Sequence, residues 1–263
     1  MRTFEVLSCF SYNQFRMNSV LETKQEGRVL RLWLNRPSQR NSLTTELCRE
    51  LVDLIDRAEK DPSVGSVLLA GRGESFCAGM DLNEIAAADV ERVSGVQEAL
   101  FTMGARLTKP LIAAVQGAAV GSGTGVVANC HVVIASEDAT FGITGIRMGL
   151  WPFVFFNAVA TAVGERRALA LTITGEVFNA AEALRLGLVH QVVPIEDVDL
   201  RALEVAQTVA NYSSFALSSG LGFVHQVEGQ TWKAAAGVGR LVRDEFLKST
   251  EFRANLEAFL NQK

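Results

Sequence analysis

The sequence lacks the residue patterns that mark most metal, disulfide and redox sites. Its 263 residues include four cysteines, none in a CxxC pair or at a spacing typical of zinc ligands. The histidines are also few, at His131, His190 and His225. We therefore expect reduced thiols, no metal and a cytoplasmic protein, with histidines that belong to the core or the surface.

Strongly basic segments and long apolar runs are missing as well. The formal net charge is -4, and the only adjacent basic pair is Arg166–Arg167, which argues against a nucleic-acid surface. No charged residue occurs from Leu111 to Ser136, but polar side chains and four glycines interrupt this stretch, so we expect no membrane span. The first 25 residues lack the apolar run of a signal peptide.

Strands and helices alternate in the first two thirds of the chain, which predicts an α/β fold. We divide the chain into a disordered extension at residues 1–26, an α/β core at 27–195 and a helical region at 196–263. The predicted strands are Val29–Asn35, Ser66–Ala70, Leu111–Val115, Val132–Ala135 and Leu188–Val193. The predicted helices are Thr44–Lys60, Gly121–Asn129, Phe153–Val163, Arg166–Thr174, Ala180–Leu186, Asp199–Asn211, Ser213–Gln226 and Thr231–Leu260.

The segment Val120–His131, VGSGTGVVANCH, has glycines at three alternate positions and contains no acidic residue. It does not fit a Walker loop, because no lysine follows the glycines, and its glycine spacing differs from that of a dinucleotide fingerprint. The serine is one position away from its place in a GxSxG nucleophile elbow. Glycines before a helix leave backbone N–H groups free, and such donors suit an anion or an oxygen that becomes negative during a reaction. The alternative is a tight strand–helix junction that requires small residues.

Four segments occur together in the order and spacing of one known family. Together they resemble the crotonase superfamily, that is the enoyl-CoA hydratase/isomerase family, over residues 27 to 263. The resemblance implies ββα units wound into a spiral, with a C-terminal helical region used for trimerisation. The segments are NRPSQRNSLT at Asn35–Thr44, GRGESFCAGMDLNEI at Gly71–Ile85, the stretch Lys109–Pro152 that contains the glycine run, and LTITGEVFNAAEALRLGLVHQVVP at Leu171–Pro194.

The resemblance also implies an acyl-CoA ligand of fatty acid metabolism, with coenzyme A as part of the substrate and no permanently bound cofactor. By position, the backbone N–H groups of Met80 and Ser122 form an oxyanion hole for the thioester oxygen, which gains charge as an enolate forms. The implied partners are an acyl-CoA and further copies of the chain, in a homotrimer or a dimer of trimers. The implied contacts to coenzyme A are Ala78, Asp81 and Leu82 along the pantetheine and adenine, and Arg36 and Arg40 near the phosphates.

The sequence departs from the hydratases of this family at both acid–base positions. Those enzymes use one glutamate after the glycine run and another in an FGxPE segment to add water across a double bond. The matching positions here are Gly125 and, within FGITG, Gly145. Because glycine offers neither a proton nor a lone pair, ordinary two-glutamate hydration is not expected. Isomerases of the family often keep only the second glutamate, which is also absent.

Other branches of the family fit only in part. The dehalogenase branch has an aspartate where this chain has Phe153. Naphthoyl-CoA synthases have a QTG segment that can hold bicarbonate, and FGITG shares Thr144 and Gly145 with it but has Ile143 in place of the glutamine. Decarboxylation or thioester hydrolysis could rely mainly on the oxyanion donors. A homologue that only binds acyl-CoA is the remaining alternative.

Two groups of residues are candidates to complete the pocket. Glu84 is the best-placed acid because it follows the oxyanion segment, and Glu98 and Asp138 are weaker candidates. The bulky residues of Gly149–Phe156 predict a dry wall for the acyl group, made of Trp151, Phe153 and two further phenylalanines. Solvated acids and ordinary helix packing are the alternatives for these groups.

Overall fold

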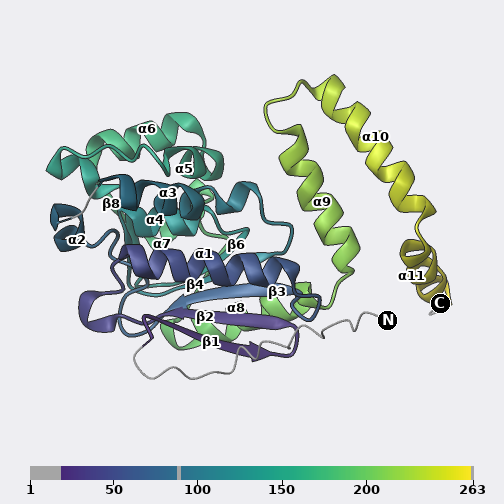
Figure 1. The fold of residues 1–263 in the computed structure, drawn as a ribbon, viewed down its shortest axis with the longest axis horizontal. Helices are drawn as coiled ribbons and strands as arrows, with labels where there is room; N and C mark the ends of the chain where they lie inside the picture. Colours follow the sequence, from purple (N-terminus) through teal and green to yellow (C-terminus); the bar gives the residue numbers. More distant parts are fainter. Residues whose placement is uncertain (1–18, 88–89, 262–263) are drawn as a thin grey trace, which may run out of the picture.

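The computed structural model describes residues 19–87 and 90–261, and its centre is a six-stranded sheet in the order β1-β2-β3-β4-β6-β9 (Figure 1). β1 and β2 are antiparallel, and every other neighbouring pair is parallel. A second sheet has three strands in the order β5-β7-β8. The strands are Leu21–Glu26 (β1), Val29–Leu34 (β2), Ser66–Gly71 (β3), Leu111–Val115 (β4), Ala118–Val120 (β5), Val132–Ser136 (β6), Thr140–Gly142 (β7), Val177–Asn179 (β8) and Gln191–Val193 (β9).

The helices confirm the predicted α/β alternation and the helical C-terminal third. Several begin at a capping side chain: Thr44 accepts a hydrogen bond from the N–H of Leu47 at the start of α1 (3.2 Å), and Asn179 accepts one from Glu182 at the start of α7 (2.9 Å). Their bounds are Thr45–Lys60 (α1), Leu82–Ala87 (α2), Val90–Phe101 (α3), Ser122–Ala128 (α4), Phe156–Val163 (α5), Glu165–Thr174 (α6), Ala180–Leu186 (α7), Val198–Ala210 (α8), Ser214–Val227 (α9), Trp232–Lys248 (α10) and Thr250–Leu260 (α11).

Both faces of the main sheet are covered. Leu30, Leu32 and Leu34 of β2 point to the face that α1 covers, whereas Val29 and Trp33 point to the face that α8 covers. The sequence of a parallel strand that is buried on both faces is a nearly continuous run of apolar residues. This explains why β2, β3, β4 and β6 could be predicted from the sequence.

The strand β1 corrects the predicted boundary of the N-terminal extension. Leu21–Glu26 pairs with β2 along its whole length, from Leu21 opposite Leu34 to Glu26 opposite Val29. A disordered extension over residues 1–26 is therefore wrong for Leu21–Glu26, and residues 1–18 lie outside the described residues. The strand was missed because it lies at the sheet edge, where only Leu21 is fully buried and its other side chains are polar.

The C-terminal helices α9, α10 and α11 extend away from the sheet, on the side opposite α2 and α6 (Figure 1). The single helix predicted over Thr231–Leu260 is wrong, because the chain becomes extended at Ser249 (φ -64°, ψ 144°). The Ser249 side chain accepts a hydrogen bond from the N–H of Phe252 and so begins α11 (3.1 Å). The helix predicted from Phe153 begins three residues later, at Phe156.

Candidate functional site

The chain segments that lead into Met80 and Ser122 run side by side as parallel neighbours. The N–H of Cys77 donates to the carbonyl of Ala118 (2.9 Å), and the N–H of Val120 donates back to the carbonyl of Cys77 (3.0 Å). These two bonds fix the two segments against each other directly before the predicted oxyanion residues. The predicted Met80 and Ser122 are therefore brought together by the fold.

The parallel pairing ends at Gly121, which has a φ of +58° and turns the chain into α4. The N–H of Gly121 donates to Gly142 (2.7 Å), but the N–H of Ser122 has no acceptor among the described residues. A Cβ on Gly79 would lie only 3.3 Å from the Ser122 nitrogen. Because Gly79 has no side chain, the approach to this N–H stays open.

The N–H of Met80 is directed to the same side. Leu43 donates to the carbonyl of Gly79 (2.8 Å) and accepts from the N–H of Asp81 (2.9 Å). In a parallel ladder, the residue between two such bonds turns its own N–H away from that partner. The Met80 N–H therefore faces away from Leu43, toward the segment of Ser122, and it too has no acceptor within the part of the chain described.

A hydroxyl group lies near Gly121, the residue before Ser122. A Cβ on Gly121 would lie 3.8 Å from the Thr144 Oγ1 and 3.9 Å from the Gly79 Cα, so all three residues border one space. Thr144 begins the short 3-10 helix Thr144–Met148 and is partly buried. Its hydroxyl has no hydrogen-bond partner among residues 19–87 and 90–261. The site thus combines two free N–H groups with one free hydroxyl.

Two buried polar residues that the sequence analysis missed hold the glycine run in place. The Thr124 hydroxyl lies 2.7 Å from the Ala119 carbonyl and accepts from the N–H of Gly142 (3.1 Å), which links α4 to β5 and β7. Asn129 donates to the Gly125 carbonyl (2.9 Å). Both stand within VGSGTGVVANCH, where a polar residue in an otherwise apolar run is the signal that could have found them.

An ion pair fixes the loop that follows Met80. The Arg36 guanidinium donates to the Asp81 carboxylate (3.1 Å) and to the Ser42 hydroxyl (3.0 Å), and both charged side chains are largely buried. Burial favours a higher pKa for Asp81, but hydrogen bonds from Arg36, the Glu84 backbone and Ser42 outweigh it and hold that pKa below its ordinary value. The structure thus gives Arg36 and Asp81 a positioning role.

A third missed residue, Asn41, ties the neighbouring loops together. It is fully buried, has a φ of +54° and donates to the carbonyls of Arg72 (2.9 Å) and Ser75 (2.7 Å). Asparagine tolerates this left-handed conformation better than most residues. Next to it, the Arg40 carbonyl accepts from the N–H of Ala78 (2.9 Å). Two predicted contacts to coenzyme A thereby lie beside the Met80 loop.

Two of the predicted coenzyme A contacts, Arg40 and Leu82, have exposed side chains beside the loop that contains Met80. The Arg40 side chain is exposed, and the Leu82 side chain, at the start of α2, is 53% exposed. Both flank the segment from Ala78 to Asp81 in the chain or by hydrogen bonding.

The positions predicted for the glutamates have no room for a side chain. A Cβ on Gly125 would stand 2.7 Å from the ring of Phe155, and a Cβ on Gly145 would stand 2.9 Å from the carbonyl oxygen of Leu150. Real Cβ atoms essentially never make contacts below 3.0 Å. Glycine at both positions is thus matched to its surroundings.

The three candidate acids do not contact the free amides. Glu84 accepts from the N–H of Thr45 (2.8 Å) and so caps α1, and Asp138 accepts from the Ser136 hydroxyl. Glu98 is exposed on α3. Within the described residues, none of the three carboxylates is hydrogen-bonded to the N–H group of Met80 or of Ser122.

The aromatic wall differs in part from the prediction. Trp151 is partly buried and stacks on Phe156, with ring centroids 6.1 Å apart. Phe153 is 80% exposed, so the dry position predicted for it is wrong. It lies in the turn before α5, where the buried place is taken by Phe155, which is 7% exposed.

Two histidines, the partly buried His131 and the exposed His190, act as hydrogen-bond acceptors for the sheet. Nδ1 of His131 accepts from the N–H of Leu111 (2.9 Å), and Nδ1 of His190 accepts from Val133 (3.0 Å). Burial lowers the pKa of both imidazoles, which favours the neutral form that can accept. The structural role expected for these two histidines is confirmed. Burial also raises the pKa of the Cys77 thiol to about 12.

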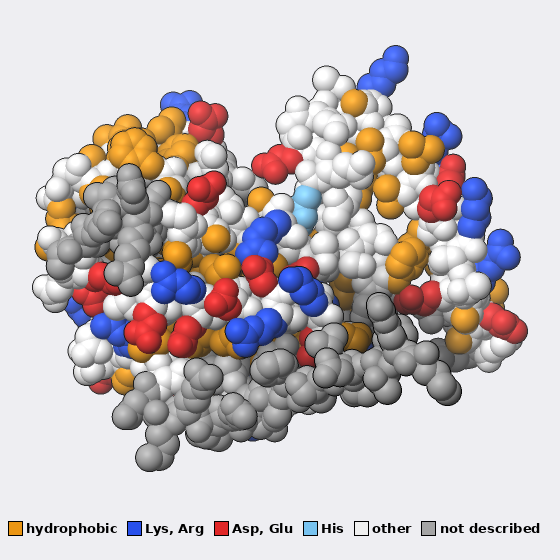
Figure 2. Space-filling model, in the orientation of Figure 1, with side chains coloured by type: hydrophobic (Ala, Val, Ile, Leu, Met, Phe, Trp, Pro, Cys, Tyr) orange, Lys and Arg blue, Asp and Glu red, His pale blue; other side chains and the backbone are white. Residues whose placement is uncertain are grey.

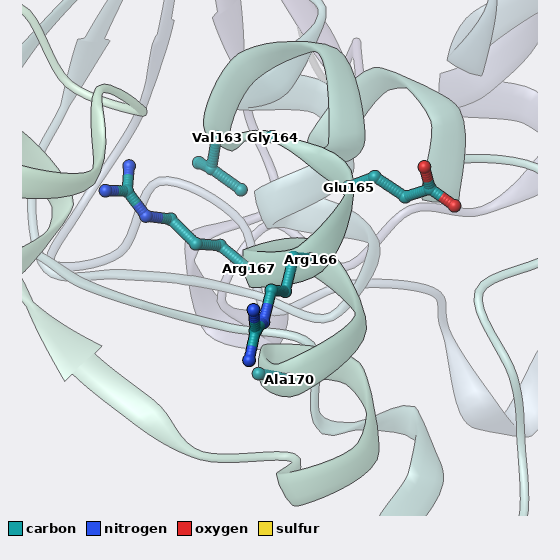
Figure 3. Close-up of a pocket in the computed structure, with 6 residues that line it drawn as sticks. All are labelled: Val163, Gly164, Glu165, Arg166, Arg167 and Ala170. Carbon is teal, nitrogen blue, oxygen red and sulfur yellow. The ribbon is translucent and has the colours of Figure 1, made fainter.

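A separate pocket of about 620 Å³ lies where α5 meets α6 (Figure 3). It contains none of the predicted site residues. No group of metal-ligating side chains occurs in the described part of the chain, and no helix there is long and apolar enough to cross a membrane. The pocket is lined by Val163, Gly164, Glu165, Arg166, Arg167 and Ala170.

These features define an α/β protein whose candidate site is built from backbone donors, and comparison with known proteins gives its family. The enoyl-CoA hydratase/isomerase family profile matches residues 24–263. The 2,3-dehydroadipyl-CoA hydratase of Escherichia coli (strain K12) is 31% identical over 249 residues, covering 94% of this chain and 97% of that protein. The hydroxycinnamoyl-CoA hydratase-lyase of Pseudomonas fluorescens is 32% identical over 212 residues, covering 76% of each.

A solved structure supports the same assignment. The crystal structure of an enoyl-CoA hydratase from Mycobacterium smegmatis superimposes with a TM-score of 0.88 at 28% identity, covering 93% of this chain and 97% of that chain. The chain belongs to the enoyl-CoA hydratase/isomerase family, and its fold is the crotonase fold of ββα units with C-terminal helices. Members of this family act on acyl-CoA thioesters.

Proposed function

We propose that this protein binds an acyl-CoA thioester and stabilises the enolate of its acyl group with the backbone N–H groups of Met80 and Ser122. One observation carries the proposal: both N–H groups lack an acceptor among the described residues, and the Ser122 nitrogen lies beside Gly79, the residue before Met80. The thioester oxygen would accept two hydrogen bonds there.

The proposed chemistry needs no ionisable side chain at the carbonyl. When the α carbon loses a proton or a carboxylate group, negative charge moves onto the thioester oxygen. Amide dipoles that are already fixed by Cys77 and Leu43 stabilise this charge without reorganising. Loss of one such donor typically costs about 3–4 kcal/mol of transition-state stabilisation.

We take Gly125 and Gly145 to be the positions of the two hydratase glutamates. Both lack room for a side chain, which supports a reaction other than two-glutamate hydration. In that case the substrate itself, or a bound bicarbonate, would accept the proton or supply the leaving group, and the Thr144 hydroxyl would donate a hydrogen bond to it. Substrates with their own acidic group, as in decarboxylation, or a bound bicarbonate fit this requirement.

Coenzyme A would enter as part of the substrate, along the surface beside Arg40, Ala78 and Leu82. The acyl group would extend toward Thr144 and Trp151. We further propose a homotrimer or a dimer of trimers, because Figure 2 shows hydrophobic side chains along the C-terminal helices. Exposed apolar side chains of this kind mark interaction surfaces, and they include Val224, Trp232, Leu241, Phe259 and Leu260.

A second candidate is a protein that binds acyl-CoA without catalysis. The filled spaces at Gly125 and Gly145 favour it, because no carboxylate can take either place without a change elsewhere. Calorimetry with a panel of CoA thioesters, followed by mass spectrometry of the incubated thioesters, separates the two. Binding with turnover supports the enzyme and binding without turnover supports the second candidate. Folded protein that binds no CoA thioester contradicts both.

A further inference from the structure

We propose that Phe155 sets the size and polarity of the acyl group that this site accepts. This inference rests on the proposed acyl-CoA function. Its basis is the relation between Phe155 and Gly125, in which the aromatic ring occupies the space that a side chain at position 125 would take.

The ring of Phe155 is held against the backbone of α4. A Cβ on Gly125 would meet Phe155 Cγ at 2.7 Å and Cβ and Cδ2 at 2.9 Å each. Phe155 is 7% exposed, and its ring packs at a tilt against Phe101, with centroids 5.4 Å apart. Since it is enclosed on several sides, the ring forms a fixed wall.

The space that Phe155 fills lies toward the N-terminal end of α4, where the Ser122 amide is. Gly125 stands three residues after Ser122 on α4, so the two positions lie on the same face of the helix. Each Cα–Cβ bond of a helix tilts toward the N-terminus. The space filled by Phe155 therefore lies on the Ser122 side of Gly125, beside the carbons that would follow a bound thioester carbonyl.

This placement limits the acyl group in two ways. An aromatic ring offers no proton acceptor and excludes water from the first acyl carbons, which favours an apolar group there. The same ring blocks the room that a longer chain would enter. The site should accordingly prefer short acyl groups, and removal of the ring should open space for several methylene groups.

The test measures how affinity depends on acyl length. Calorimetry with saturated CoA thioesters from acetyl to octanoyl compares wild type, Phe155→Ala and Phe178→Ala. Phe178 is a matched control because it is 8% exposed and stacks on another ring, that of Phe141. We expect Phe155→Ala to gain about fourfold in affinity per added methylene over the middle of the series. Wild type and Phe178→Ala should gain little beyond the shortest chains.

The outcomes distinguish a failure of the role proposed for Phe155 from a failure of the proposed acyl-CoA binding. If affinity depends on acyl length in the same way in all variants, the role of Phe155 is overturned but the proposed function is not. Folded protein that binds no thioester in any variant overturns the proposed function and this inference with it. Should Phe155→Ala not fold, Phe155→Leu replaces it, with a smaller gain per methylene expected and no gain contradicting the proposal.

A stability cycle tests the Gly125–Phe155 contact without a ligand. In the wild-type background, Gly125→Ala should lower the unfolding midpoint because its methyl group meets the ring. In the Phe155→Ala background, the same change should lower the midpoint less, since only the contact with the Cβ of residue 155 remains and alanine favours a helix over glycine. An equal lowering in both backgrounds would mean that the ring does not occupy this space.

Discussion

A Cβ atom on Gly79 would lie 3.3 Å from the amide nitrogen of Ser122. Gly79 also has a φ of +94°, a conformation that side chains disfavour. Two independent requirements, backbone conformation and close approach, therefore meet at one glycine. A side chain here would crowd the Val120 carbonyl oxygen at 3.0 Å and the nitrogen of the N–H group that we assign to the thioester oxygen.

Gly79→Ala should weaken the binding of CoA thioesters while the fold persists. The added methyl group obstructs the Ser122 N–H, so affinity for CoA thioesters should fall at least about tenfold, as for the loss of one hydrogen bond. The positive φ should cost roughly 1–2 kcal/mol of stability. Calorimetry and urea unfolding measure the two effects separately.

Gly27→Ala is the matched control for that substitution. Gly27 has a φ of +60° and nothing within 4 Å of an added Cβ, so it shares the conformational strain without the obstruction. It should lose no more stability than Gly79→Ala, whose added Cβ also crowds the Val120 carbonyl at 3.0 Å, and it should keep its affinity. Equal affinities in the two variants would show that Gly79 does not border the binding site.

Thr144→Val should weaken acyl-CoA binding by about 1 kcal/mol, or roughly fivefold, because it removes a hydroxyl but keeps the side-chain shape. Thr144→Ser should restore most of the loss. Calorimetry with one CoA thioester across the three proteins is sufficient. Full affinity in Thr144→Val would remove this hydroxyl from the site.

Asp81→Asn should make the free energy of unfolding depend less on pH in the acid range. The folded pKa of Asp81 lies below its ordinary value of 3.8, so the unfolded chain takes up the proton first as the pH falls. The stabilisation is complete above that ordinary value and is lost as the pH falls through the lowered folded pKa. At neutral pH the substitution should cost about 1–3 kcal/mol, because it weakens the bonds to Arg36.

Urea unfolding between about pH 3 and pH 7 measures this difference. Asp53→Asn provides the control, since Asp53 is exposed on α1 and its substitution removes the same formal charge. An acid slope that is identical in wild type and Asp81→Asn would show that the Arg36–Asp81 pair does not stabilise the loop.

His131 and His190 should make the fold sensitive to mild acid. Burial lowers both folded pKa values below the ordinary 6.5, so the unfolded state binds more protons in that range. Their contribution is complete above about pH 6.5 and is lost as the pH falls through the lowered values. His131→Asn with His190→Asn retains an acceptor that does not titrate. The double variant should therefore lose less stability between about pH 7.5 and 5.5, whereas an unchanged loss would point to other groups.

The sequence predicts those elements whose pattern is local or continuous. The helix α1 was found from its buried stripe and its Thr44 cap, and the central strands were found because both faces are covered. The strands β5, β7 and β8 have three residues each, too few to show a period. The break at Ser249 lies within a pattern that remains helical on both sides.

The site residues also divide into those that a local sequence pattern reveals and those that it does not. Met80 and Ser122 could be proposed from glycine patterns and family resemblance, and the structure brings their segments together. Asn41 could not be proposed, because its role depends on contacts between distant segments. Phe155 was predicted only as part of the aromatic wall, and its contact with Gly125 could not be foreseen for the same reason. The exposed position of Phe153 depends on the turn before α5, which the aromatic composition of that segment does not reveal.

The most direct test of the account is the infrared carbonyl stretch of a bound CoA thioester labelled with ¹³C at its carbonyl carbon. If the Met80 and Ser122 N–H groups polarise this carbonyl, its stretch should shift to lower frequency on binding than in water, and Gly79→Ala should reduce the shift in whatever complex it still forms. A thioester that calorimetry shows to be bound, but whose carbonyl keeps its solution frequency, would contradict the account.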